Sequence, residues 1–244
     1  MRQLTDPVNV ELQQRTQVRA PQGEQADTNA VVPSDLLTRW LALGGVIGPI
    51  LFVAAFTVGG ILRPGYSPIH QAVSDLGVGS NPWLLNVSLV LLGVLLSAFA
   101  TSFFHSLLPT LSRTWRWVCA VFLACTGLGF ADAGIFTEAP ATVALHWMIG
   151  MPLLALGSIV GILLTGLALR HDTLWRRWSI YSLVASITTL VLIGTMFWIW
   201  TPGTPLASLK LGGLMERVLF IEVLAWYVAF GWRLFRGAPT LAKD

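Results

Sequence analysis

The sequence has little charge. Asp, Glu, Lys and Arg make up 11% of its 244 residues, whereas apolar residues make up 55%. Water-soluble domains carry roughly 25% charged residues, so this scarcity excludes an ordinary soluble globular protein. The apolar residues fall in long, continuous runs, which predict a multi-pass membrane protein.

Cysteine is equally scarce. The two cysteines, Cys119 and Cys125, lie six residues apart in one apolar run. On a helix they would point about 120° away from each other, so a disulfide within that helix is excluded. They are interpreted as small apolar packing residues.

Motifs for several common chemistries are missing. The chain has no nucleotide-binding loop, no nucleophile elbow and no dinucleotide-binding fingerprint. Its four histidines include no His-x-x-x-His or Glu-x-x-His spacing that would favour zinc. No basic stripe interleaved with exposed aromatic residues indicates a nucleic-acid partner. We therefore expect no metal, no cofactor and no nucleic acid.

Long apolar segments are what the chain does contain. A membrane core of about 30 Å requires roughly 20 apolar residues in a helix, and six segments reach that length. Strict alternation is absent, so they are helices rather than barrel strands. The predicted fold class is an all-α bundle of six transmembrane helices near residues 40–62, 83–107, 115–136, 143–169, 178–200 and 213–235.

Lys and Arg predict the orientation, because loops with positive charge stay in the cytoplasm. Only Arg63, Lys210 and Arg217 fall outside if both termini are cytoplasmic, and twelve of the fifteen cations then lie inside. We therefore predict an N-in, C-in protein of the plasma (inner) membrane. The inside cations are Arg2, Arg15, Arg19, Arg39, Arg113, Arg116, Arg170, Arg176, Arg177, Arg233, Arg236 and Lys243.

The segments outside the bundle are polar and short. Residues 1–33 are rich in Gln, Arg, Asp and Pro and predict a disordered cytoplasmic tail. The transmembrane domain is expected over 34–237, with a short cytoplasmic tail over 238–244. No cleaved signal peptide is evident, so the first span should act as its own insertion signal.

Five acidic residues lie in or beside the apolar segments, and the predicted topology places all of them in the outer half. A charged Asp at mid-helix costs at least ~2.5 kcal/mol on insertion scales, so it persists only where neighbours or water compensate it. We therefore expect the functional site in this half. The five are Asp75, Asp132, Glu138, Glu216 and Glu222.

The loop after the first span is the most characteristic stretch of the chain. It reads Arg63-Pro-Gly-Tyr-Ser-Pro-Ile-His-Gln-Ala-Val-Ser-Asp-Leu-Gly77. We expect a short surface helix over 68–76 that places His70 and Ser74 on one face, with Asp75 beside them and able to pair with Arg63. The stretch forms either a satisfied interfacial turn or one wall of a binding site. The candidate substrate-binding residues are Arg63, His70, Ser74, Asp75, Glu216 and Arg217.

Three residues are candidates for catalysis. Asp132 lies one turn from the outer end of the third span, and His146 opens the fourth span across a short loop. These spans should be antiparallel neighbours, so Asp132 and His146 could form a pair that moves protons or orients a water. Glu222 lies deeper, in the sixth span, where its charged form would be costly.

Several motifs together resemble a known family. They are Gly48-Pro-Ile-Leu-Phe52 in the first span, the Arg63 to Gly77 loop, Gly134-Ile-Phe136 at the end of the third span and His146 at the start of the fourth. The pattern resembles the bacterial six-span membrane family catalogued as domain of unknown function nine-nine-eight, over roughly residues 40–235. The resemblance implies a six-helix integral membrane domain and no established activity.

Three classes of function remain open. One is an outward-facing enzyme or binder for an amphiphilic or lipid molecule, working through carboxylate and histidine acid–base chemistry. A second is a proton-coupled small-solute transporter. A third is a membrane scaffold whose polar groups only hold helices together. Polar residues thin out toward the cytoplasmic side of the fifth and sixth spans, which favours the first class.

Overall fold

The computed structural model describes residues 33–107 and 110–237. Within these ranges every regular element is helical. The predicted tail over 1–33 lies outside the described residues except for its last residue, and the tail over 238–244 lies wholly outside them.

Six helices in the described ranges are long and apolar enough to cross a membrane: Leu36–Leu62, Trp83–Ser106, Arg113–Ile135, Val143–Leu169, Arg176–Trp200 and Gly212–Phe235. This confirms the predicted all-α, six-helix fold of a multi-pass membrane protein. The helices therefore contact the lipid bilayer. The N-in, C-in orientation and the choice of the plasma membrane stay predictions.

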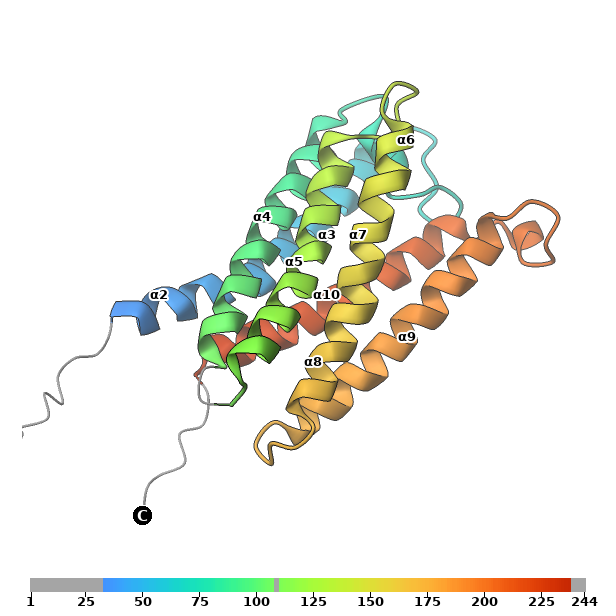
Figure 1. Cartoon of the computed structure of the whole chain (residues 1–244). Coiled ribbons are helices and arrows are strands. Elements are labelled where there is room, and N and C mark those ends of the chain that lie inside the picture. The colour runs from blue at the N-terminus through green and yellow to red at the C-terminus, as the bar shows by residue number, and fades with distance from the viewer. Residues whose placement is uncertain (1–32, 108–109, 238–244) are drawn as a thin grey trace, which may run out of the picture. The chain divides into compact units, whose positions relative to one another are not determined.

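The spans follow one another along the chain as shown in Figure 1. The first comprises α2 (Pro33–Ala42) and α3 (Gly44–Leu62), the second is α4 (Trp83–Ser106), the third α5 (Arg113–Ile135), the fifth α9 (Arg176–Trp200) and the sixth α10 (Gly212–Phe235). The fourth span is composite: α6 (Val143–Leu145), η2 (His146–Gly150), α7 (Met151–Ala155), η3 (Leu156–Gly161) and α8 (Ile162–Leu169).

The fourth span owes its composite character to two π-helical turns, η2 and η3. Pro152, at the start of α7, has no amide hydrogen and so cannot continue regular α-helical bonding. The Met151 amide instead donates to the His146 carbonyl, five residues back. Such π-turns insert a residue into the helical register and re-aim nearby side chains, often at functional sites.

Small residues bring α4 and α5 into backbone contact. A Cβ atom built on Gly93 would lie 2.5 Å from the carbonyl oxygen of Gly127, and one built on Gly127 would lie 2.6 Å from the carbonyl oxygen of Gly93. Without a hydrophobic drive between helices in lipid, such close approach is a main source of helix association. Helices α4 and α5 therefore pack with their backbones in direct contact at these two glycines.

Aromatic side chains fill the centre of the bundle. Phe99 of α4 lies edge-on to Tyr227 of α10, with ring centroids 5.2 Å apart. Phe52 of α3 contacts Phe130 of α5 at 5.6 Å and Phe220 of α10 at the same distance. Offset and edge-to-face contacts of this kind add to burial, and they join α3, α4, α5 and α10 around one core.

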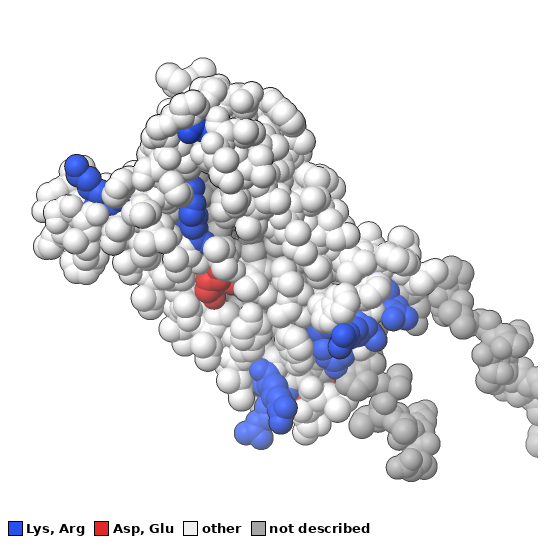
Figure 2. Space-filling view, turned by 180° about the vertical axis from the view of Figure 1, so that it is seen from behind, with Lys and Arg blue, Asp and Glu red and all other residues white. Residues whose placement is uncertain are grey.

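The two ends of the bundle differ. One end, called the arginine-rich end here, carries Arg113, Arg170, Arg176 and Arg233. It is the end at which α5 and α9 begin and at which α8 and α10 end. Figure 2 shows the larger group of Lys and Arg side chains toward one end of the face it presents, with further Lys or Arg side chains on the rest of that face and an acidic patch close to one of them. The opposite end, called the loop end here, carries the connections over 63–82, 136–142 and 201–211.

Helix α9 follows the fourth span only part of the way. It packs along α8 and η3 and then diverges from the fourth span toward its own end at Trp200 (Figure 1). Its outer face is apolar and exposed, as at Ile187 and Val191. The divergence opens space between the fourth and fifth spans at the loop end.

We expect Gly127→Ala to destabilise the fold by about 1–3 kcal/mol, because its methyl group would meet the Gly93 carbonyl. Gly194→Ala is the matched control, since a Cβ atom at Gly194 meets no atom within 4 Å. The thermal midpoint of the detergent-solubilised protein should fall for the first variant only. Equal midpoints for the two would contradict the close approach of α4 and α5.

Candidate functional site

A cavity of about 800 Å³ lies at the loop end, between the loop over 72–77, α5, the fourth span, α9 and α10. This is within the ~300–1,000 Å³ of small-molecule sites. Most of its lining is apolar and includes Phe52, Leu89, Phe130, Leu219 and Phe220. A polar cluster of Ser74, Asp75, Glu138, His146 and Glu216 forms the remaining wall.

Three aromatic residues mark where the cavity reaches the surface. Trp147 of the fourth span is 43% exposed, and Phe197 and Trp200 of α9 are 53% and 46% exposed. All three also line the cavity. The cavity therefore opens between the fourth and fifth spans, where α9 diverges.

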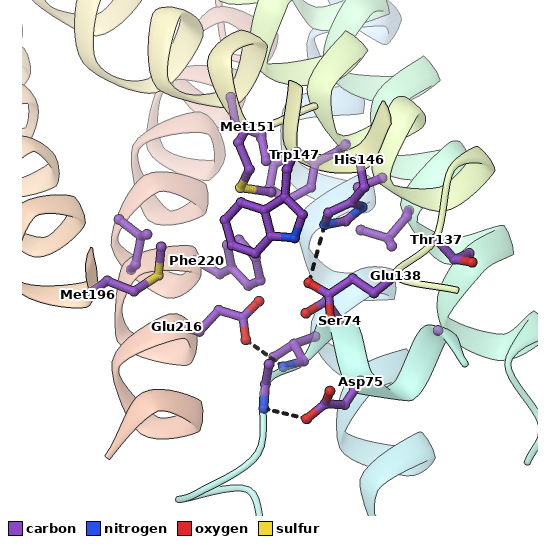
Figure 3. Close-up of a pocket in the computed structure, with 18 of the residues that line it drawn as sticks. Ser74, Asp75, Thr137, Glu138, His146, Trp147, Met151, Met196, Glu216 and Phe220 are labelled. Carbon is purple, nitrogen blue, oxygen red and sulfur yellow. Dashed lines mark hydrogen bonds and ion pairs between the residues drawn. The ribbon is translucent and has the colours of Figure 1, made fainter. Parts of the chain in front are cut away.

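A main-chain carbonyl group ten residues earlier in the chain fixes His146 at the polar wall. Its side chain is 3% exposed, and Nδ1 lies 2.9 Å from the carbonyl oxygen of Phe136. A carbonyl can only accept, so Nδ1 carries the hydrogen and donates it. Nε2 is then turned toward Glu138, whose Oε1 lies 3.6 Å away. Figure 3 shows this pair across the polar wall.

The short loop over 136–142 sets up this pair. It joins α5 to the fourth span, and the Thr142 hydroxyl donates to the Thr137 carbonyl over 2.7 Å and ties the loop to itself. Phe136 caps α5, so its carbonyl is available to His146. Glu138 sits within the same loop and reaches back over the cavity.

Burial is the main influence on Glu138. It raises the pKa of the Glu138 carboxyl above its ordinary value, while the His146 imidazole and the Ser74 hydroxyl act in the opposite direction and Asp75 adds to the rise. The side chain is 21% exposed. Glu138 is therefore a carboxyl that holds its proton more tightly than a glutamate in water.

Glu216, in the first turns of α10, joins the loop to the helix. It is 8% exposed, and its Oε2 accepts a hydrogen bond of 2.5 Å from the Val73 amide. Its other oxygen, Oε1, accepts no hydrogen bond from any described residue and lies on the cavity side. Asp75 Oδ2 accepts from the Ala72 amide over 3.0 Å. Figure 3 shows both carboxylates reaching the same strip of loop backbone.

Arg63, His70 and Arg217 hold the loop instead of lining the cavity. Arg63 donates to the carbonyls of Asp75 and Val78, so it meets the main chain of Asp75 and not its carboxylate. The imidazole of His70 meets the Lys210 carbonyl at 2.7 Å.

Of these three residues, Arg217 makes the largest number of hydrogen bonds that hold the loop. It donates to the carbonyls of Pro68, Gln71 and Gly213 and to the Tyr66 hydroxyl. The Tyr66 hydroxyl in turn donates to the Ala72 carbonyl over 2.6 Å. Burial raises the pKa of Tyr66, and the Arg217 hydrogen bond opposes that rise. Arg217 thus ties the loop to the start of α10 through several acceptors at once.

The expected surface helix over 68–76 is not formed. The structure has turns over 68–73 and a 3-10 helix over Ser74–Gly77. The reason is that carbonyl groups of the loop accept hydrogen bonds from α10. The Leu214 amide donates to the Ile69 carbonyl over 3.0 Å, and the Arg217 guanidinium donates to the Gln71 carbonyl. Gly213 permits the contact, since a Cβ atom there would lie 2.0 Å from the Gln71 carbonyl oxygen.

Asp132 lies behind the polar wall and not on it. It is buried, and its Oδ2 has no partner among the described residues. It faces the π-turn η2, where a Cβ atom at Gly150 would come within 2.7 Å of Oδ2. Among the described residues the carboxylate within 4 Å of the His146 imidazole is Glu138, at 3.6 Å, so the nearest acidic partner of His146 is Glu138 and not the expected Asp132.

Glu222 lies in the seam between α9 and α10, away from the cavity lining. Thr189 Oγ1 is 2.6 Å from Glu222 Oε2 and 2.9 Å from the Ala185 carbonyl oxygen. The hydroxyl has one hydrogen, and the Ala185 carbonyl can only accept. The Thr189 hydroxyl donates to one or the other of these acceptors, so it is the polar partner of the Glu222 carboxyl group in this seam.

The structure thus divides the predicted site residues into two groups. Ser74, Asp75, His146 and Glu216 meet at the cavity, whereas Arg63, His70, Asp132, Arg217 and Glu222 lie outside its lining. Glu138 lines the cavity but was not among the predicted site residues, because Asp132 was expected to be the partner of His146. It lies only eight positions before His146 in the sequence. In the described residues no three His, Cys, Asp or Glu side chains group as metal ligands would.

Comparison with known proteins agrees with this architecture. The model of the family described as protein of unknown function (DUF998) matches residues 46–233. The chain belongs to this family, which confirms the resemblance of its motifs. Curated proteins and solved structures gave no match.

Removing the acceptor at position 216 should weaken the loop contact. Glu216→Leu leaves the buried Val73 amide without a partner and should cost about 1–3 kcal/mol of stability. Glu216→Gln keeps a carbonyl oxygen there and should recover most of it. Thermal unfolding of both variants measures the difference, and equal losses would show that the hydrogen bond is not what stabilises the loop.

Glu138 should make stability depend on pH. Because its pKa is higher in the folded protein, its contribution is present at low pH and is lost as pH rises through the folded-state pKa. Glu138→Gln cannot ionise. Its thermal midpoint should therefore rise relative to that of the wild type as the pH increases from about 4, near the ordinary glutamate pKa, through the folded-state pKa. A midpoint difference that does not change with pH would refute this account.

Proposed function

We propose that the protein takes an amphiphilic or lipid molecule from the membrane into the cavity and holds or transforms it by acid–base chemistry at Glu138 and His146. The observation that carries the proposal is the shape of the site. An apolar chamber opens between two spans at exposed aromatic residues and ends at a polar wall. A molecule with an apolar chain and a polar head matches both parts.

The polar wall supports proton transfer. The Phe136 carbonyl fixes the His146 tautomer, so Nε2 is the nitrogen that faces the cavity. In that state Nε2 can accept a proton from a bound group, and Glu138 at 3.6 Å would stabilise the imidazolium that results. His146 is therefore the proposed general base, and Glu138 its orienting partner. Asp132, behind the wall, is a proposed supporting carboxyl.

A second candidate function is proton-coupled transport, and Glu222 favours it. Thr189 gives the Glu222 carboxyl group a hydrogen-bond partner inside the sixth span. A carboxyl that takes up and releases a proton there could couple to solute movement. The buried hydroxyls that continue along α9, Ser186 and Ser182, each donate to a main-chain carbonyl, so these two described residues offer no free hydroxyl hydrogen for a proton path.

A bulky residue in the chamber tests the amphiphile proposal. Met196 lines the cavity and is buried, whereas Val191 on the same helix faces outward. We expect Met196→Trp to lower co-purifying lipid or amphiphile by at least about tenfold, as measured by native mass spectrometry. Val191→Trp should retain the wild-type amount.

The same measurement identifies a failure. Equal amounts of bound amphiphile in both variants, with both folded, would place binding on the general lipid-facing surface. No bound amphiphile in any form, including wild type in lipid extract, would favour the scaffold or transport class.

A further inference from the structure

The charge of the cavity wall points to the head group of the bound molecule, and this inference rests on the proposed function. The ionisable residues that line the cavity are Asp75, Glu138, His146 and Glu216. No Lys or Arg is among the described lining residues. The wall therefore carries three carboxyl groups and one imidazole.

The nearest guanidinium groups are committed elsewhere. Arg217 donates to two loop carbonyls, to the Gly213 carbonyl of its own helix and to the Tyr66 hydroxyl, and Arg63 donates to two further carbonyls. Neither lines the cavity. An anionic head group in the cavity would thus meet carboxylates without a cation to balance it.

Two nearly buried side chains present unused polar atoms to the cavity. Glu216 is 8% exposed and uses only Oε2, so Oε1 remains as an acceptor. His146 is 3% exposed and uses Nδ1 on Phe136, while Nε2 stands 3.6 Å from Glu138, beyond hydrogen-bond length. Neither atom has a hydrogen-bond partner among the described residues, and each can accept a hydrogen bond from a ligand. A donor-rich ligand group would supply that partner.

Aromatic faces lie beside these acceptors. Trp147 stands between His146 and Glu216 in Figure 3, and Phe220 lies on the α10 side of the same space. A cation within about 6 Å of such rings is attracted by their π-electrons. Carboxylates combined with aromatic rings form a typical environment for an ammonium group.

We propose that the molecule bound in the cavity is an amphiphile with a cationic amine head group. Its ammonium group lies among Glu216, Glu138 and Asp75 and against Trp147, and its apolar chain follows the lining of Phe130, Leu219 and Phe220 toward the opening between the fourth and fifth spans. A primary ammonium brings three donors to carboxylate oxygens. Alkyl phosphates and fatty acids are disfavoured because their heads repeat the charge of the wall.

Three ligands with one alkyl chain test the head group directly. Hexadecylamine, hexadecanol and hexadecyl phosphate are titrated against the whole protein, and bound adducts are counted by native mass spectrometry. We expect hexadecylamine to bind at least about tenfold more tightly than hexadecanol, and hexadecyl phosphate to bind most weakly.

Variants that each remove one carboxylate test which residues cause the preference for hexadecylamine over hexadecanol. Glu216→Gln retains the Val73 hydrogen bond and should reduce the amine preference about tenfold while leaving hexadecanol binding unchanged. Glu138→Gln is the second variant should the first not fold. Asp172→Asn, which removes a carboxylate outside the cavity but keeps the oxygen that accepts from Leu174 and Trp175, is the matched control and should behave as wild type.

The outcomes separate this inference from the proposed function. Equal binding of amine and alcohol, both lost in Met196→Trp, overturns the cationic head group and keeps the amphiphile cavity. Tightest binding of the phosphate also overturns it. If none of the three binds wild type, or if all bind Met196→Trp equally, both proposals fail.

Discussion

Docking of the loop over 63–77 onto the first turns of α10 is the contact on which the site depends. Glu216 receives the Val73 amide and Arg217 gathers the carbonyls of Pro68 and Gln71, so adjacent residues of one helix satisfy opposite polarities of the loop backbone. Within or near a bilayer, water cannot replace these partners freely. The docked loop brings Ser74 and Asp75 to the cavity and completes its polar wall.

The divergence of α9 gives the site its other half. The fourth span and α9 stay together at the arginine-rich end and part toward the loop end, where Trp147 and Trp200 remain exposed beside the cavity. The π-turn η2 of the fourth span lies in the part where the two spans separate, and it carries His146 and Trp147. The irregular part of one helix thus supplies both the polar group and part of the opening.

The transmembrane helices could be predicted well, because runs of about 20 apolar residues follow from bilayer thickness alone. Most predicted ends fall within a few residues of the observed ones, as at Trp83, Val143 and Trp200. The site was harder to predict. The partner of His146 depends on the path of a short loop, and the π-turns and loop docking depend on contacts distant in sequence. Glu138 and Glu222 were both singled out as acidic residues in or beside apolar segments, and the sequence does not distinguish them. Of the two, only Glu138 lines the cavity.

The hydrogen bond between Thr189 and Glu222 also bears on how the chain enters the membrane. Ribosomal synthesis delivers α9 before α10, so the threonine hydroxyl is already in place when the glutamate leaves the translocon. A carboxyl group that has a hydrogen-bond partner when it enters the hydrocarbon core inserts at a lower free-energy cost than one without a partner. The order of the last two helices along the chain therefore favours their insertion as a hairpin.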